Sequence, residues 1–290
     1  MNSDPIVIDN NFGWTACPCC DSGLVWRKGS FHYGKPQPYS SVSVSLLRKP
    51  ELWKCRECDS GFICNAVSET DSRRLYEIGN SSSRWTKTEF EQSKTKKALK
   101  LISGALQNKA DVMDVGCGSG SFLDFARRFG CQTTGVEYSI ECQAILAAQG
   151  HHRFSSLDQV EGRFDLIVAF DLVEHLYDIN RYLSLFHQRL VPGGSLVIIT
   201  GDINCLSAKL AGAKWWYNSY PEHVVFPSMK FFSRLPGWRV RRKNGILASP
   251  YYEHSWKHTL KQTLKQFLRR YYTGVPSFVS DHLFLELVTC

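Results

Sequence analysis

The central part of the chain alternates short apolar runs with segments of helical character. The runs are DVMDV (111–115), QTTGVE (132–137), FDLIVAF (164–170) and SLVIIT (195–200). Apolar strands that alternate with helices indicate a parallel sheet covered on both faces. Ahead of the first run, apolar side chains at near-helical spacing predict a helix over roughly 87–107. These patterns predict an α/β domain in the middle of the chain.

The flanking regions do not show this alternation. In the first, SVSVS (41–45) alternates with period two, which is typical of a ribbon strand. In the last, GWRVRR (237–242) and DHLFLELV (281–288) predict two further strands. A linker of low apolar content, 78–86, separates the first region from the α/β domain. We predict two domains, 1–83 and 84–290, with the core of the second at 85–235 and a basic helix and last strand at 250–290.

The segment WKHTLKQTLKQFLRRYY (256–272) predicts that basic helix. Its basic stripe consists of Lys257, Lys261, Lys265 and Arg269, and its apolar stripe of Leu260, Leu264, Phe267 and Leu268. One interpretation is a helix docked by its leucines with a solvated basic face. The other is contact with phosphate groups or an anionic membrane surface. The pattern leaves both open.

Composition and charge narrow the class of protein. With 290 residues, 43% hydrophobic and 21% charged, the chain is globular and long enough for roughly two domains. The net charge of +8 comes entirely from residues 201–290, which carry 13 basic and 5 acidic side chains. This favours an anionic small molecule or surface over general nucleic-acid binding. Neither a membrane-spanning run nor a secretory signal pattern is evident, so we expect a cytoplasmic location.

Two C-x-x-C pairs in the first region predict a zinc site. They are ACPCCDS (16–22), with Cys17 and Cys20, and WKCRECDS (53–60), with Cys55 and Cys58. Four thiolates from two such turns match the tetrahedral preference of a structural zinc ion, and the region has too small a core to be stable without it. Nearby Cys19, Cys64 or His32 are alternative ligands. Free thiols or a redox pair are the competing interpretation.

The stretch VMDVGCGSGSF (112–122) predicts a cofactor site. It places Gly116, Gly118 and Gly120 behind an apolar run, while a dinucleotide fingerprint would require its third Gly or Ala at Ser121. A strand that ends in glycines and leads into a helix offers backbone N–H groups and a positive helix end. Glu137 ends the next strand, where a carboxylate can accept hydrogen bonds from ribose hydroxyls.

Four segments resemble, in their order and spacing, the class I S-adenosylmethionine-dependent methyltransferases of the small-molecule type. They are VMDVGCGSG, GVE, FDLIVAFDLVEHL and LVPGGSLVIIT. The resemblance covers about residues 85–235 and, more weakly, the last strand. It implies a Rossmann-like, doubly wound sheet of seven strands, preceded here by the small zinc ribbon. It implies an enzyme with S-adenosylmethionine as cofactor. The implied contact residues are Asp114, Gly116, Cys117, Gly118, Gly120, Glu137, Tyr138, Ser156, Leu157, Phe170 and Asp171.

Within that set, the resemblance implies that Asp114 and the glycine turn hold the methionine part and that Glu137 holds the ribose. Phe170 and Asp171 would lie beneath the sulfonium, and Ser156 with Leu157 would lie near the adenine. Methyl transfer requires an aligned nucleophile, and a base only where the acceptor still carries its proton.

His223, in YPEHVVF (220–226), is the candidate base, with Glu222 or Tyr220 to orient it. His175 is a further candidate. Each histidine has a competing interpretation as a residue that hydrogen-bonds a loop. The aromatic residues at 215–217 predict either a lid over the site or a cover for the core.

We therefore predict a methyltransferase that acts on a small-molecule or carrier-linked acceptor, with a phosphate-bearing sugar favoured over an uncharged quinone-like compound. An RNA methyltransferase is one alternative, although the balanced charge of residues 1–83 argues against nucleic acid. A binding protein that has kept the fold without the activity is another. Oxygen, nitrogen and carbon acceptor atoms all stay open, and so does the oligomeric state.

Overall fold

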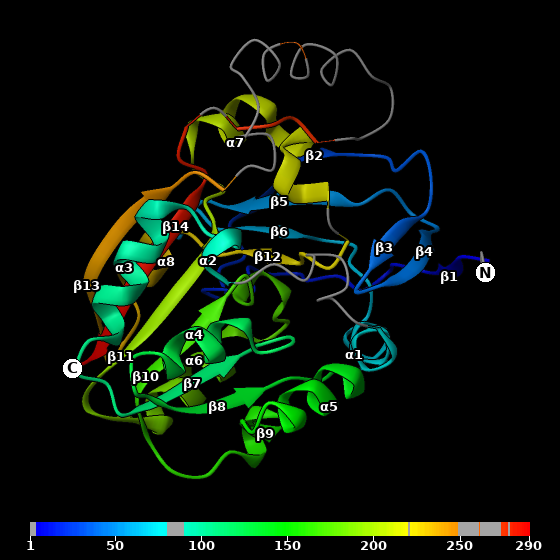
Figure 1. The fold of residues 1–290 in the computed structure, drawn as a ribbon. Coiled ribbons are helices and arrows are strands. Elements are labelled where there is room, and N and C mark those ends of the chain that lie inside the picture. The colour runs from blue at the N-terminus through cyan, green and yellow to red at the C-terminus, as the bar shows by residue number, and fades with distance from the viewer. Residues whose placement is uncertain (1–3, 80–89, 220, 249–260, 262–273, 278) are drawn as a thin grey trace.

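The structure is a computed structural model that describes residues 4–79, 90–219, 221–248, 261, 274–277 and 279–290. Its centre is a seven-stranded sheet with the order β13-β14-β11-β10-β7-β8-β9 (Figure 1). The strands are β7 (Asp111–Val115), β8 (Gln132–Val136), β9 (His152–Phe154), β10 (Phe164–Phe170), β11 (Leu190–Gly201), β13 (Trp238–Ile246) and β14 (His282–Thr289). The predicted Rossmann-like sheet of seven strands is confirmed.

The strand order places a ligand site at one edge of this sheet. Strands β7 to β11 pair in parallel, whereas β14 is antiparallel to both β11 and β13. From β7 the chain proceeds through β8 and β9 on one side and then through β10 and β11 on the other. Open α/β sheets bind ligands at such a switch point, outside the carboxyl ends of the strands. The glycine loop follows β7 at this edge.

Helices cover both faces of the sheet, as the continuous apolar runs predict. Helices α3 (Lys96–Leu106), α4 (Ser121–Arg127) and α5 (Ile140–Ala148) contribute to one apolar cluster, and α6 (Ile179–Arg189) and α8 (Met229–Phe232) to another. Successive strand residues alternate between the clusters, so Val112 enters the first and Met113 the second.

The helix predicted over 87–107 is interrupted. The structure has a short helix α2 (Phe90–Ser93) and then α3, while residues 87–89 lie outside the described ranges. Between them Thr95 is extended (φ −67°, ψ 153°), and its side chain accepts a hydrogen bond from the backbone N–H of Ala98. A threonine in this conformation is a helix N-cap, so it begins a new helix instead of continuing the old one.

The N-terminal region forms two small sheets and one helix. Strands β1 (Ile6–Ile8), β4 (Val42–Leu46) and β3 (Gln37–Tyr39) make the first sheet. The second has the order β12-β6-β5-β2, from β2 (Val25–Ser30), β5 (Glu51–Cys55), β6 (Gly61–Ile63) and β12 (Val225–Phe226). Helix α1 (Glu69–Ile78) follows them in the chain. Because β12 lies just after His223, the second sheet joins the N-terminal region to the segment that carries the candidate base.

Shorter elements complete the description. They are α7 (Leu206–Ala211) and 3₁₀ turns at Leu157–Gln159, Val173–His175, Gly212–Lys214 and Trp216–Ser219. The aromatic segment is buried, with exposed fractions of 0%, 6% and 3% for Trp215, Trp216 and Tyr217, so it covers the core. The predicted basic helix at 256–272 lies outside the described residues except for Lys261. Among the described helices, none has the length and apolar character needed to cross a membrane.

Candidate active site

The glycine loop turns sharply at the carboxyl end of β7. Gly116, Gly118 and Gly120 have φ angles of +76°, +53° and +84°, a region that side chains with a Cβ atom enter only at a cost. The N–H groups of Gly116 and Cys117 both point to the carbonyl oxygen of Val136, at 2.8 and 3.3 Å. The loop is therefore fixed against β8, and the helix α4 begins directly after it.

The three glycines face different surroundings. A Cβ atom at Gly116 would lie 3.0 Å from Leu172, and one at Gly120 would lie 2.6 Å from Leu146, so these two glycines permit close packing. The N–H of Gly118 instead donates to Glu137 Oε2 at 2.9 Å. The central glycine thus faces the carboxylate that the sequence predicts to hold the ribose.

Glu137 lies at the end of β8 with both oxygens directed toward backbone N–H groups. Its Oε1 accepts from the N–H of Ser139 at 2.9 Å, next to the start of α5. Burial raises the pKa of Glu137, although the N–H donors at Ser139 and Gly118 oppose that rise. The following residue, Tyr138, has its hydroxyl 2.9 Å from that of Tyr182.

Asp114 is a buried carboxylate without a hydrogen-bond partner among the described residues. It lies on β7, just ahead of the glycine loop, and is only 4% exposed. Burial, followed by the charge of Glu137, raises its pKa to about 8, while Lys94 opposes the shift. A buried carboxylate with no partner is costly unless a cation binds beside it. The residues present therefore fit a cofactor with a positively charged amino acid part.

Phe170 ends β10 on the other side of the switch point, and Asp171 directly follows it. The ring of Phe170 stacks on Phe90 at 5.9 Å between centroids. Asp171 has a positive φ of +49°, and its Oδ2 lies 3.2 Å from Lys94 Nζ. Burial would raise the pKa of Asp171, but the charges of Lys94 and then His282 lower it below the usual value. Sequence patterns gave no signal for Lys94, which reaches this edge only through the fold.

Ser156 and Leu157 lie in the turn after β9. The Ser156 side chain accepts a hydrogen bond from the N–H of Asp158 at 3.3 Å and caps the short 3₁₀ turn. Leu157 is 2% exposed and belongs to the apolar cluster that contains α6. Both follow β9 at the edge where the glycine loop lies.

Two histidines face each other beside this edge. Their rings meet edge to face, with 4.8 Å between the centroids of His175 and His223. His223 is 7% exposed, and its Nδ1 lies 2.8 Å from the carbonyl oxygen of Tyr217. Because a carbonyl oxygen only accepts, Nδ1 carries the proton, and the lone pair of the neutral ring is on Nε2. A general base needs that lone pair.

The N-terminal region supplies part of the histidine environment. The Nδ1 atom of His175 lies 3.1 Å from the carbonyl oxygen of Glu222 and 2.9 Å from the hydroxyl of Tyr76 on α1. The carboxylate of Glu222 accepts from the N–H of Ser40 at 2.7 Å. Tyr76 and Ser40 belong to no motif, so sequence analysis missed both. Tyr220 lies outside the described residues.

Glu174 is a fully buried acid next to the two histidines, with a carboxylate oxygen within 4.8 Å of a ring nitrogen of each. It accepts hydrogen bonds from the hydroxyl of Tyr217 and, at 2.8 Å, from that of Thr200. Burial, followed by the charge of Asp171, raises its pKa to about 7. These contacts connect the 3₁₀ turn of His175 to the aromatic segment and to β11.

The four predicted cysteine ligands come together at the edge of the second N-terminal sheet. Their sulfur atoms all lie within 4.8 Å of one another, with 3.6 Å between Cys17 and Cys58 and between Cys20 and Cys55. Sulfurs around a tetrahedral zinc are about 3.8 Å apart, given a Zn–S distance of about 2.3 Å. After each pair an aspartate, Asp21 or Asp59, has a positive φ (+56° and +60°).

The alternative ligands lie outside this group. Cys64 Sγ is directed to the carbonyl oxygen of Trp14 at 3.8 Å.

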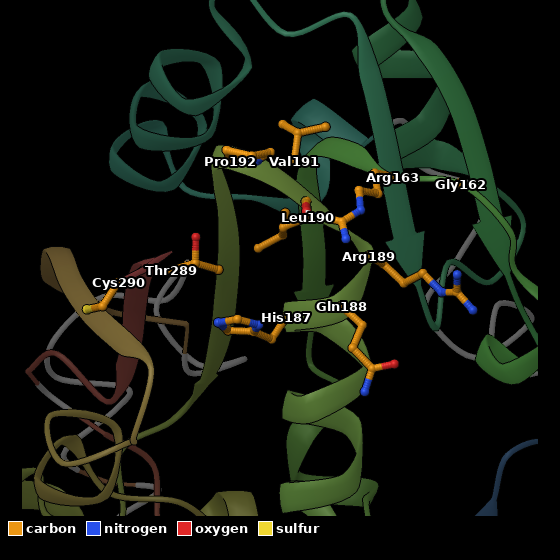
Figure 2. Close-up of a pocket in the computed structure, with 10 residues that line it drawn as sticks. All are labelled: Gly162, Arg163, His187, Gln188, Arg189, Leu190, Val191, Pro192, Thr289 and Cys290. Carbon is orange, nitrogen blue, oxygen red and sulfur yellow. Dashed lines mark hydrogen bonds between the residues drawn. The ribbon is translucent and has the colours of Figure 1, made fainter.

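A pocket of about 640 Å³ lies at the opposite edge of the large sheet. Figure 2 shows its lining, which includes Arg163 ahead of β10, His187 and Arg189 at the end of α6, and Thr289 at the end of β14. These residues flank the amino ends of the parallel strands, far from the glycine loop in the topology. This pocket is therefore separate from the candidate active site.

The fold and this site define a class I methyltransferase, with the glycine loop, the carboxylate after β8 and the seven-stranded order in place. A family model described as a methyltransferase domain matches residues 88–263. The chain belongs to this methyltransferase family, and the class predicted from the sequence is confirmed.

Two curated relatives carry the name ubiquinone biosynthesis O-methyltransferase. The protein of Bradyrhizobium sp. (strain ORS 278) is 32% identical over 124 residues, which are 40% of this chain and 47% of the relative. That of Nitrobacter winogradskyi is 32% identical over 159 residues, 48% and 60% of the two chains. The chain thus spans about half the length of the curated relatives it matches.

Solved structures show similarity at lower identity. Magnesium protoporphyrin IX methyltransferase from Synechocystis PCC 6803, solved with bound SAH, is 14% identical, with a TM-score of 0.48 over 77% of this chain and all of that one. The N-methyltransferase NodS from Bradyrhizobium japonicum WM9, in complex with S-adenosyl-L-homocysteine, is 14% identical, with a TM-score of 0.49 over 76% and 97% of the two chains.

Proposed function

We propose that this protein transfers a methyl group from S-adenosylmethionine to a small-molecule or carrier-linked acceptor. The observation that carries the proposal is Asp114, a buried carboxylate with no hydrogen-bond partner among the described residues, beside a glycine loop whose central N–H points to Glu137. A cationic amino acid part would compensate the first carboxylate, and ribose hydroxyls would meet the second. The sulfonium group of the bound cofactor supplies an activated methyl.

The chain's own groups divide the remaining work. The glycine loop brings backbone N–H groups close to the cofactor, and Phe170 with Asp171 bounds the site across the switch point. His223 removes the acceptor proton at Nε2, because Nδ1 is held as a donor by the carbonyl of Tyr217. The hydroxyl of Tyr76 and the carbonyl of Glu222 orient His175, whose ring packs against that base.

The cysteine group holds a structural zinc ion in this proposal. All four positions of a tetrahedral site are filled by sulfur, which leaves none for water or substrate. The turn at Cys55 and Cys58 joins β5 to β6, and β6 pairs with β12 through Phe62 and Val225. Zinc would therefore stabilise the strand that directly follows His223.

A phosphate-bearing acceptor, such as a nucleotide-linked or lipid-linked sugar, is our favoured class. The excess of basic residues in 201–290 supports it. The curated relatives are named for ubiquinone biosynthesis, so an uncharged quinone-like acceptor is the competing class.

The test is methyl transfer from S-adenosylmethionine labelled in its methyl group. The purified protein is incubated with a panel of nucleotide-linked sugars, with polyprenyl-phosphate-linked sugars and with hydroxylated quinones. We expect label in a phosphate-bearing sugar. Label only in the quinones would contradict a phosphate-bearing acceptor and favour an uncharged quinone-like one. Label only in added tRNA or rRNA fragments would contradict a small-molecule acceptor. Absence of cofactor binding would contradict the proposal as a whole.

A further inference from the structure

Strand β14 begins at a buried ionisable pair that the cofactor and base assignments do not use. Asp281 is fully buried, and His282 is 3% exposed. The Nδ1 atom of His282 lies 3.0 Å from Asp281 Oδ1, and its Nε2 lies 3.9 Å from Asp171 Oδ1. Because both ring nitrogens face carboxylate oxygens, the geometry favours a ring with a proton on each nitrogen.

Asp281 connects this histidine to two other parts of the domain. Its Oδ2 accepts a hydrogen bond from Trp216 Nε1 at 2.9 Å, and its Oδ1 accepts one from the N–H of Ala248 at 2.8 Å. Its backbone N–H donates a hydrogen bond to the carbonyl oxygen of Ile246, and its own carbonyl oxygen accepts one from the N–H of Asp202. A buried carboxylate with this many donors is well satisfied, so the pair has a defined geometry.

The ring of His282 also supports the aromatic segment next to the candidate base. The Trp216 ring stacks on it at 5.8 Å with an interplanar angle of 26°, and the Tyr217 ring meets it edge-on at 4.8 Å. The Tyr217 ring in turn lies 4.2 Å from that of His223, and the Tyr217 carbonyl fixes His223 Nδ1. A single residue therefore separates His282 from the candidate base.

We propose that His282 is a positioning residue, which holds Asp171 at the cofactor edge of the sheet and the Trp216–Tyr217 rings against His223. The functional part of this proposal rests on the role of His223 in methyl transfer. The contacts themselves join three segments of the chain: the start of β14, the end of β10 and the aromatic segment before His223. His282 does not touch the reacting atoms in this account, so it acts through its neighbours.

The protonation of His282 gives this role a pH dependence. The groups that face it are Asp281 directly before its strand, Asp171 after β10, Glu174 in the 3₁₀ turn and Asp202 after β11. Tyr217 contacts its ring, and Lys94 pairs with the other oxygen of Asp171.

Burial lowers the pKa of His282. Asp281, followed by Asp171 and Glu174, has the opposite effect, and together these carboxylates outweigh burial, so the net shift of the pKa is upward. The stabilisation is therefore complete below about pH 6.5, the unfolded value, and is lost as the pH rises through the higher folded pKa.

Tryptophan fluorescence of the full chain tests the proposal without an acceptor. A protonated imidazole quenches a stacked indole, so we expect the emission to rise in a transition with its midpoint above pH 6.5. His282→Gln should remove this transition. His187→Gln is the matched control, because His187 also meets a tryptophan, Trp238, at 5.3 Å. The His187→Gln variant should retain the transition.

A second measurement reports on the base itself. In His282→Gln the ring resonances of His223 should shift in NMR spectra, and in His187→Gln they should stay. If His282→Gln fails to fold, histidine-labelled wild-type protein gives the pKa of His282, assigned through its contact with the Trp216 ring. A pKa at or below 6.5, a transition that survives in His282→Gln, or unchanged His223 resonances would each overturn the proposal.

Cofactor binding separates this proposal from the proposed function. If the wild-type protein fails to bind S-adenosylmethionine in calorimetry but shows the transition, methyl transfer is wrong, and the contacts of His282 stand. If it binds the cofactor and lacks the transition, only the positioning role is wrong.

Discussion

The cofactor side and the histidine side of the candidate site are built in different ways. The cofactor side comes from consecutive strand ends, where β7 and β8 deliver the glycine loop and Glu137 within about 25 residues of sequence. The histidine side is assembled from segments far apart in the chain, with Tyr76 on α1, His175 in a 3₁₀ turn and His223 in the loop before β12. The first depends on local backbone geometry, whereas the second depends on how the N-terminal region packs on the sheet.

This difference explains how much the sequence could predict. Backbone requirements can be read directly from the sequence, because glycine is the residue that suits φ angles such as +76° and +84°. The order of the apolar runs likewise predicted the fold class. Paired C-x-x-C turns likewise predicted which four cysteines meet.

Long-range partners leave no such trace. Lys94, Tyr76 and His282 reach the site only through tertiary contacts, and each belongs to a residue type common on surfaces or in cores. The break between α2 and α3 was also missed, because apolar spacing continued through Thr95 while its capping hydrogen bond ended the helix.

The largest expected effect comes from the cysteine group. Cys55→Ser removes one of four sulfurs, and loss of a structural zinc costs several kcal/mol in a region with a small core. We expect the variant to lose zinc in elemental analysis and to unfold at a markedly lower temperature. Cys64→Ser is the control and should retain both. A wild-type protein free of metal and equally stable after chelation would contradict the zinc assignment.

The next effect concerns the candidate base. His223→Ala removes the Nε2 lone pair, and general base catalysis contributes roughly 10²–10⁴-fold in rate. Turnover with the identified acceptor should fall by that factor, while calorimetric affinity for S-adenosylmethionine stays unchanged. His152→Ala, on the exposed surface of β9, should leave both intact. Normal turnover in His223→Ala would show that the base is elsewhere.

The glycine loop should respond mainly in cofactor affinity. Gly118→Val places a branched side chain at φ +53° next to Glu137, and we expect an affinity loss on the order of 100-fold or more. Gly162→Val tests backbone strain alone, since Gly162 has a φ of +86° in open space. Equal losses of affinity in the two variants would argue that strain, not contact with the cofactor, is responsible.

The smallest effect is a pH dependence of cofactor binding. The pKa of Asp114 is raised to about 8, so a cationic ligand binds better as the carboxyl loses its proton. Affinity should rise with pH toward about 8, by at most tenfold per unit, and protons should be released on binding, which calorimetry in two buffers detects. Asp114→Asn should bind more weakly and without this slope. A pH-independent wild-type affinity would remove Asp114 from the contact.

Calorimetric titration with S-adenosylhomocysteine, on the wild-type protein and on Glu137→Ala, tests the central claim most directly. Two hydrogen bonds from ribose hydroxyls to a carboxylate contribute about 1.5–3 kcal/mol each. We therefore predict saturable binding to the wild type and a loss of affinity of about 100-fold or more in Glu137→Ala. A wild-type protein that binds no cofactor product, or a variant that binds it equally well, would contradict the account.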